Sequence, residues 1–133
     1  MKNRLVLIVM LVTVFGCSDD EFSSVNKIVD EWKLTEIRYY TPSGNSIIAY
    51  SDVNIVYDFR NDGTLVVSGV EQGIYNNGTY EYEIEEGVVE GISDLVIFTV
   101  KIDQTYWAYD LTNGIMKLGL SHVDGPDLIF ERN

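Results

Sequence analysis

Polar and apolar residues alternate along much of this chain. The clearest case is residues 78–85, where Tyr80, Tyr82 and Ile84 alternate with Thr79 and three glutamates. In an extended chain, successive side chains point to opposite faces, so this period of two predicts a strand with one dry face and one wet face. The pattern favours antiparallel sheet.

The same criteria predict eight strands, joined mostly by short turns. They lie at residues 31–40, 54–60, 64–68, 78–85, 95–102, 105–111, 115–120 and 128–132. In the second of these, Ile55, Tyr57 and Phe59 share one face, and Asp58 and Arg60 share the other. Asp62-Gly63 and Asn113-Gly114 are tight hairpin signals, because these residues readily adopt positive φ. A short helical turn is expected at residues 25–30.

Consecutive strands joined by hairpins form a meander. The sequence therefore predicts an all-β fold, an antiparallel up-and-down meander of about eight strands that closes into a small barrel. Such a barrel removes exposed edges, and its interior is either filled by side chains or holds one small ligand. A two-sheet β-sandwich is the alternative architecture.

The N-terminal segment has a different pattern. Lys2 and Arg4 precede an uncharged apolar run over residues 5–15, which ends at Gly16 and Cys17. This is the layout of a secretory signal. The run is too short for a transmembrane helix, which needs about 20 apolar residues. Cys17 is the only cysteine of the chain.

Residues 14–17 resemble the modification site of a bacterial lipoprotein. The resemblance implies cleavage before Cys17 and acyl chains on that cysteine, which would anchor the protein to a membrane without spanning it. It divides the chain into a signal peptide (1–16), a lipidated flexible tether (17–29) and a lipocalin-like β domain (30–133). The alternative is an ordinary secreted protein with an incidental cysteine.

The residues after this cysteine are Ser18, Asp19, Asp20 and Glu21. They resemble the export tract of Bacteroidetes-type surface lipoproteins, which implies an outer-membrane location on the cell surface. A solvated acidic linker on a periplasm-facing lipoprotein is the alternative, since runs of like charge are usually solvated.

Four short motifs in order resemble small Bacteroidetes-type lipoproteins with a lipocalin-like domain. They are Trp32-Lys33-Leu34, Phe59-Arg60-Asn61-Asp62-Gly63-Thr64, Gly78-Thr79-Tyr80 and Phe130-Glu131-Arg132. The resemblance implies the barrel fold, a structural role for Trp32 at the closed end, and a ligand-carrying role.

The chain is acidic, with a net charge of −12 that becomes −14 once Lys2 and Arg4 are removed with the signal. This charge argues against nucleic-acid binding, which requires basic patches to neutralise phosphates. It would attract cations or basic protein partners.

Few residues suggest catalysis. His122 is the only histidine, so a histidine-rich zinc site is excluded, and adjacent Ser121 cannot form a triad with it because neighbouring side chains point apart. Carboxylates gather in two loops, at Glu85, Glu86, Glu90 and Asp94 and at Asp124 and Asp127. Their spacing matches no calcium loop, and solvated charge explains them better. We expect no enzyme, no metal and no cofactor.

Aromatic residues are the candidate ligand-binding set: Tyr57, Tyr80, Tyr82, Trp107 and Tyr109. Inside a barrel they would line an apolar pocket with a few hydroxyl donors. Plain core packing is the competing interpretation, because aromatics dominate small β cores.

Three functions follow in order of support. The first is a membrane-anchored binding module for a small apolar or glycan ligand. The second is an accessory lipoprotein with a filled barrel, whose loops bind another envelope protein. A hydrolase using loop carboxylates has the least support. A packed interior would favour the second hypothesis over the first.

Overall fold

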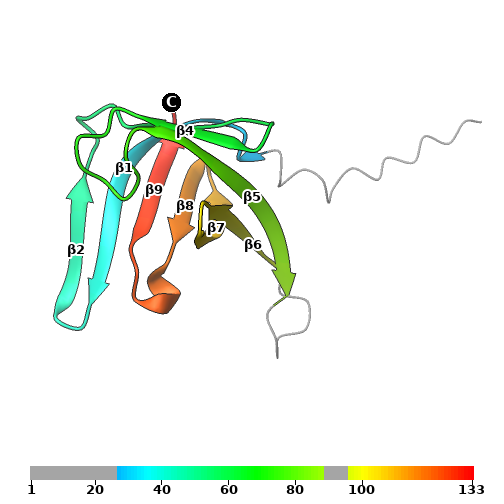
Figure 1. The fold of residues 1–133 in the computed structure, drawn as a ribbon. Coiled ribbons are helices and arrows are strands. Elements are labelled where there is room, and N and C mark those ends of the chain that lie inside the picture. Colours follow the sequence, from blue (N-terminus) through cyan, green and yellow to red (C-terminus); the bar gives the residue numbers. More distant parts are fainter. Residues whose placement is uncertain (1–26, 89–95) are drawn as a thin grey trace, which may run out of the picture.

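The computed structural model describes residues 27–88 and 96–133, and it places nine strands and one short 3-10 helix in these two ranges (Figure 1). The strands are β1 (Asp30–Thr41), β2 (Gly44–Ala49), β3 (Val56–Phe59), β4 (Thr64–Ser68), β5 (Gly78–Val88), β6 (Val96–Ile102), β7 (Thr105–Thr112), β8 (Ile115–Gly119) and β9 (Asp127–Arg132). The 3-10 helix η2 (Ser121–Val123) precedes β9. No helix in these ranges has the length and apolar character needed to cross a membrane.

Eight of the strands close into a barrel. From β3 to β9 each strand pairs antiparallel with the next, and β1 pairs with both β3 and β9. The closing seam joins Trp32 to Arg132 and Arg38 to Asp127. The prediction of an all-β, antiparallel meander barrel is confirmed, with lipocalin-like topology, and closure excludes the alternative of two separate sheets.

The alternating patterns point the expected faces inward. In β3, Tyr57 and Phe59 are buried, while Asp58 between them is partly exposed. In β5, Tyr82 is buried and Tyr80 and Ile84 are partly buried, whereas the glutamates between them are exposed. The period of two therefore identified the core faces of these strands.

Both hairpin signals form tight turns. Asn113 and Gly114 have φ angles of 53° and 78°, so both adopt the left-handed conformation that such a turn needs. At the other turn, Gly63 has a φ of 83°. The carboxylate of Asp62 accepts hydrogen bonds from the backbone N–H and the hydroxyl of Thr64, at 3.0 and 2.6 Å.

Strand β2 was not predicted. It forms a hairpin with the second half of β1, from Glu36 opposite Ala49 to Thr41 opposite Gly44. The first half of β1 pairs instead with β3. A bulge between Leu34 and Glu36 separates the two halves, and bulges of this kind bend a strand. All six residues of β2 are exposed, so burial imposes no alternation on its sequence.

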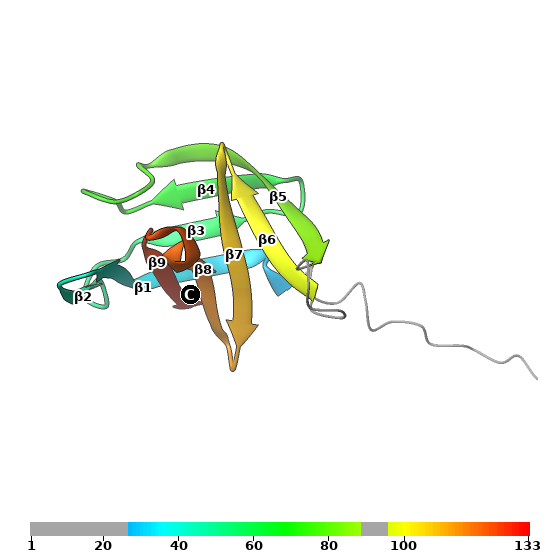
Figure 2. The same ribbon diagram turned by 90° about the horizontal axis from the view of Figure 1, so that it is seen from below.

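The strand directions define two ends of the barrel. At the near end lie Lys27, where the described chain begins, the Asn113-Gly114 turn and the C-terminal residue Asn133. At the far end lie the β1–β2 hairpin and the loops at residues 69–77 and 120–126. In Figure 2, β2 lies at the left and β1 begins at the right. Of the helical turn expected at residues 25–30, the first two residues lie outside the described chain, Lys27 is 3-10 helical and β1 begins at Asp30.

Candidate functional site

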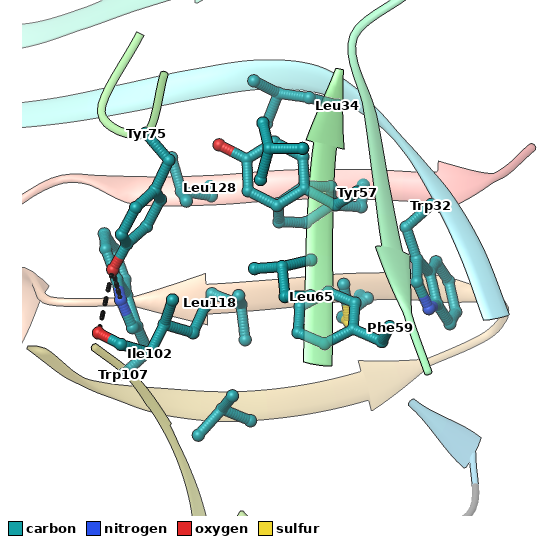
Figure 3. Packing of buried hydrophobic residues seen from close by; sticks show 14 of the residues in the cluster. Trp32, Leu34, Tyr57, Phe59, Leu65, Tyr75, Ile102, Trp107, Leu118 and Leu128 are labelled. Atoms are coloured by element: carbon teal, nitrogen blue, oxygen red, sulfur yellow. Dashed lines mark hydrogen bonds between the residues drawn. The ribbon is translucent and has the colours of Figure 1, made fainter. Parts of the chain in front are cut away.

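Side chains fill the interior of the barrel, as Figure 3 shows for part of the cluster. The aromatic members of this cluster are Trp32, Tyr57, Phe59, Tyr75, Tyr82, Trp107 and Phe130. Aliphatic side chains from β1, β4, β6, β8 and β9 and from residues beside the strands complete it, among them Leu34, Leu65, Ile102, Leu118 and Leu128. Most of these side chains are fully buried, so the space between the walls is occupied by the protein itself.

Two of the predicted binding residues, Tyr57 and Trp107, lie at the centre of this cluster. Both are 1% exposed. The ring of Tyr57 packs edge-on against Phe130, with 4.9 Å between the ring centroids. Burial raises the pKa of the Tyr57 hydroxyl well above its usual value, so this group stays protonated in the folded protein.

Tyr75 also enters the interior, although it comes from the loop at residues 69–77. Its hydroxyl accepts a hydrogen bond from the indole Nε1 of Trp107 at 2.8 Å and donates a longer one, of 3.5 Å, to the carbonyl of Ile102. Burial raises the pKa of Tyr75, and the bond from Trp107 partly opposes that shift. The Tyr75 side chain thus fills the far end of the barrel interior.

The loop that carries Tyr75 is held in a defined shape. The side-chain amide of Asn77 accepts from the Val70 N–H at 2.8 Å and donates to the Val70 carbonyl at 3.0 Å, which ties its two ends together. At its start, Gly69 has a φ of 78°, and a Cβ there would collide with the carbonyl of Asn54. Only glycine fits this position without a shift of the backbone.

Sequence reasoning missed Tyr75. The surrounding residues, with Gly73 before it and Asn76 and Asn77 after it, gave the signature of an exposed loop. The available signal was the adjacent pair Ile74 and Tyr75, two large apolar residues in a loop whose only other apolar side chain is Val70.

The hydroxyls of two other predicted residues are committed to the backbone. Tyr82 donates to the carbonyl of Arg60 at 2.6 Å, and its ring meets that of Phe59 edge-on with 5.0 Å between centroids. Tyr80 donates to the carbonyl of Asn76 at 2.9 Å. Both bonds stabilise loops next to the strands.

Tyr109 differs from these residues, because its hydroxyl oxygen is buried without a hydrogen-bond partner among the described residues. Burial raises its pKa to about 12, and Asp110 contributes to the shift. The ring lies near the near end beside a hollow of about 210 Å³ that is also lined by Lys27, Phe98 and Leu111.

The structure therefore divides the predicted set. Tyr57, Tyr80 and Trp107 surround the ring of Tyr75, with centroid distances of 6.4, 5.2 and 6.2 Å. Tyr82 and Tyr109 lie apart from this group. A role of any of the five in ligand binding stays a prediction, and the space that three of them enclose holds the Tyr75 ring.

At the near end, Trp32 is fully buried, in keeping with a structural role. Its indole Nε1 donates to the carbonyl of Ile28 at 2.8 Å, and the guanidinium of Arg132 lies 4.7 Å from its ring centroid. Arg132 also forms an ion pair with Asp30. The first and last strands are thus joined around one aromatic ring.

At the far end, a hollow of about 500 Å³ opens between the chain after β2 and the loop that carries Tyr75. It is lined by Tyr50, Val53, Ile55, Glu71 and Gln72. A phenol ring, a carboxylate and an amide beside two aliphatic side chains form a mixed lining, as in small-molecule sites. None of these residues was among the predicted binding residues.

Exposed apolar side chains also gather at the far end. Of the nine large hydrophobic residues that are exposed in residues 27–88 and 96–133, five lie in β2 and in the loops of this end. They are Ile47, Ile48, Val53, Ile74 and Val123. Clusters of exposed apolar residues are characteristic of contact surfaces, whereas single ones are ordinary.

The remaining polar candidates that the structure describes are exposed or hold a loop in place. His122 is exposed on η2, and Asp124 ends that helix with a φ of 59°. Asp127 is buried, and its carboxylate accepts the Ser121 N–H at 3.2 Å, which anchors the loop. Glu85 and Glu86 are exposed on β5, while Glu90 and Asp94 lie outside the described residues. In residues 27–88 and 96–133, no three histidine, cysteine or acidic side chains come together as a metal site.

Comparison with known proteins finds no matching family model, no similar curated protein and no similar solved structure. The chain forms an eight-stranded antiparallel β-barrel domain with a buried aromatic cluster.

Proposed function

We propose that this protein is a membrane-tethered interaction domain that binds another protein of the cell envelope through the far end of its barrel. The observation that carries the proposal is the filled interior. Tyr75 occupies the space between Tyr57, Tyr80 and Trp107, so binding by the folded domain falls to its outer surface. Among the described residues, more of the large exposed apolar side chains lie at the far end than at the near end.

The tether follows from the lipoprotein resemblance at Cys17, which lies outside the described residues. Acyl chains on this cysteine would hold the protein at the outer membrane, with Ser18 to Glu21 directing it to the cell surface. The described chain starts at the near end of the barrel. A tether attached there leaves the far end accessible to other proteins.

Charge narrows the kind of partner. The mature chain, with a net charge of −14, repels acidic surfaces and attracts basic ones. We therefore propose a partner surface with apolar side chains in a neutral or basic setting.

The tether is tested by Cys17→Ala in the full chain. We expect the variant to lose membrane association while its circular dichroism spectrum stays that of a folded β protein. A Ser18→Ala variant is the matched control and stays on the membrane. Membrane retention of Cys17→Ala after signal removal would overturn the anchor.

Partner binding is tested by photo-crosslinking in the host cell. Ile74 and Ile115 are each 37% exposed, but Ile74 lies at the far end and Ile115 at the near end. A photoreactive benzoylphenylalanine at position 74 should give one discrete crosslinked protein, and the same group at position 115 should not. Equal crosslinking from both positions, or from neither, would contradict the proposal.

One observation favours a second function, the binding of a small ligand in the far-end hollow. Tyr50 could stack on a sugar ring, while Glu71 and Gln72 could bond to hydroxyl groups. Nuclear magnetic resonance titration with neutral oligosaccharides tests this function. Saturable shifts confined to Tyr50, Val53 and the loop at residues 69–77 would support it.

A further inference from the structure

Strand β2 has an unpaired edge. In the described part of the chain its sole neighbour is β1, and β2 stands at the end of the strand order. Figure 1 shows it at the outer side of β1, with no other strand beside it. In an antiparallel strand, alternate N–H and C=O groups point to each edge, so β2 presents a row of free backbone donors and acceptors.

This edge lacks the usual protection. Exposed edges normally carry charged side chains or proline, which block pairing with other chains. Residues 41–51 contain no charged side chain, and the only proline, Pro42, precedes β2 in the turn. The absence of charge stands out in a chain with 21 acidic residues, of which three alternate along the exposed face of β5.

The side chains of β2 offer apolar contacts on both faces. Ile48 lies opposite Ile37 and continues the inner face of β1, whereas Ile47 lies opposite Arg38 on the outer face. Ile47 is 60% exposed and Ile48 43%. An added strand would therefore meet one isoleucine on each face. Cross-strand pairs of this kind stabilise sheets.

Geometry and charge decide between two occupants. If two copies of this chain paired antiparallel through β2, their barrels would point in opposite directions, and so would their near ends. Copies tethered to one membrane at their near ends both point away from it, so they are not oriented for this pairing. Two mature copies, each with a net charge of −14, also repel each other.

We propose that β2 is the docking edge for an extended segment of the partner protein, which adds to the sheet as a further strand. This inference rests on the proposed tether and on partner binding at the far end. The segment carries apolar or β-branched side chains at alternate positions, and neutral or basic residues between them. Main-chain hydrogen bonds supply the binding energy, and the two isoleucines select the side chains.

The direct test uses a defined probe, an acetylated and amidated peptide in which threonine and valine alternate between terminal lysines. Nuclear magnetic resonance of the full chain carrying Cys17→Ala follows the backbone amides during titration. We expect saturable binding and slowed hydrogen exchange at alternate amides of β2. The same peptide with N-methyl groups on alternate residues cannot form the ladder and should not bind.

Matched variants locate the contact. Ile47→Lys should weaken peptide binding about tenfold, because it removes an apolar contact and places a cation against the basic peptide. Ile115→Lys on β8 makes the same change in net charge at a strand that is paired on both sides, and it should leave binding unchanged.

The outcomes separate this inference from the proposed function. Peptide binding with no protection of β2, or no binding at millimolar peptide, overturns strand addition. Self-association of the unliganded protein that Ile47→Lys abolishes would assign the edge to a second copy, and it overturns the proposal too. If crosslinking from position 74 persists in the Ile47→Lys variant, the far-end partner stands and strand addition through β2 fails.

Discussion

The two ends of this barrel are built in opposite ways. At the near end, polar groups of the first and last strands bind each other. Arg132 lies over Trp32 and pairs with Asp30, and the backbone N–H of Asn133 donates to the carbonyl of Glu31 at 3.0 Å. At the far end, a hairpin projects with a free edge, and apolar side chains face solvent.

The difference indicates that the near end contributes mainly to stability, whereas the far end has groups available for binding. Groups that already bind each other, such as Arg132 and Asp30, have little left to offer a partner. An end with free backbone groups and exposed isoleucines gains stability when something covers it. The near end therefore suits attachment to a tether, and the far end suits binding.

The largest expected effect concerns the near end. Replacing Trp32 with Ala should lower the free energy of unfolding by about 3–5 kcal/mol, because a large buried ring leaves a cavity. Trp32→Phe loses the bond to Ile28 but keeps most of the ring volume, so it should lower the free energy of unfolding less than Trp32→Ala does. Urea denaturation measures both variants. A loss below about 1 kcal/mol in Trp32→Ala would show that this ring does not hold the near end together.

Tyr75 allows the matching test at the far end. Tyr75→Ala should cost about 2–4 kcal/mol, since its ring fills the space between three aromatic neighbours. Tyr75→Phe keeps the ring but leaves the buried indole N–H of Trp107 without an acceptor, which should cost about 1–3 kcal/mol. If urea denaturation gives Tyr75→Ala the stability of the wild type, the loop does not close the interior, and the filled-barrel account fails.

Two glycines with the same φ of 78° give a smaller contrast. Gly114→Ala at the near-end turn should cost about 1 kcal/mol, which is the strain of alanine in the left-handed region, because the space around its Cβ is open. Gly69→Ala carries the same strain and also collides with Asn54, so it should lower the thermal midpoint further. Equal midpoints would mean that the loop holding Tyr75 adjusts freely.

The smallest effect concerns the unpaired hydroxyl of Tyr109. Tyr109→Phe should be neutral or stabilising by up to about 1 kcal/mol at neutral pH, since it removes a buried group without a partner. Burial raises the pKa of this tyrosine to about 12, so the folded protein holds the proton more tightly than the unfolded chain does. Below pH 10 this tyrosine is protonated in both states and the free energy of unfolding does not depend on its titration. As the pH rises from 10 towards 12, the unfolded chain loses the proton first, and the free energy of unfolding falls.

The Tyr109→Phe variant should therefore lose less stability than the wild type over this alkaline range, as measured by urea midpoints. Some loss remains in both proteins, because burial also raises the pKa values of Tyr57, Tyr75 and Tyr82. Identical alkaline losses would contradict the burial of the Tyr109 hydroxyl.

The sequence was informative where burial imposes a pattern. The alternation in β5 and the turns at Gly63 and Gly114 could be predicted, because these features depend on residues that are adjacent in the sequence. Closure of β1 onto β9 follows from the number of strands and their hairpin connections. These features sufficed to predict the barrel.

Strand β2 and the loop with Tyr75 could not be predicted in this way. Exposed β2 has no buried face and hence no periodicity, although Ile47 and Ile48 are strand formers. The inward position of Tyr75 depends on Trp107, 32 residues away in the chain. The far-end site is therefore a product of tertiary structure. Three of the predicted aromatic residues surround Tyr75, but none of the five lines the far-end hollow.

In the proposed function, the far end, opposite the tether, is the part that other envelope proteins cover. Hydrogen exchange can compare the lipidated protein in its native membranes with the soluble Cys17→Ala variant. We predict that membranes containing the partner protect β2 and the loops at residues 69–77 and 120–126, and leave the Asn113-Gly114 turn unchanged. Protection of the near end alone, or of neither end, would contradict the account.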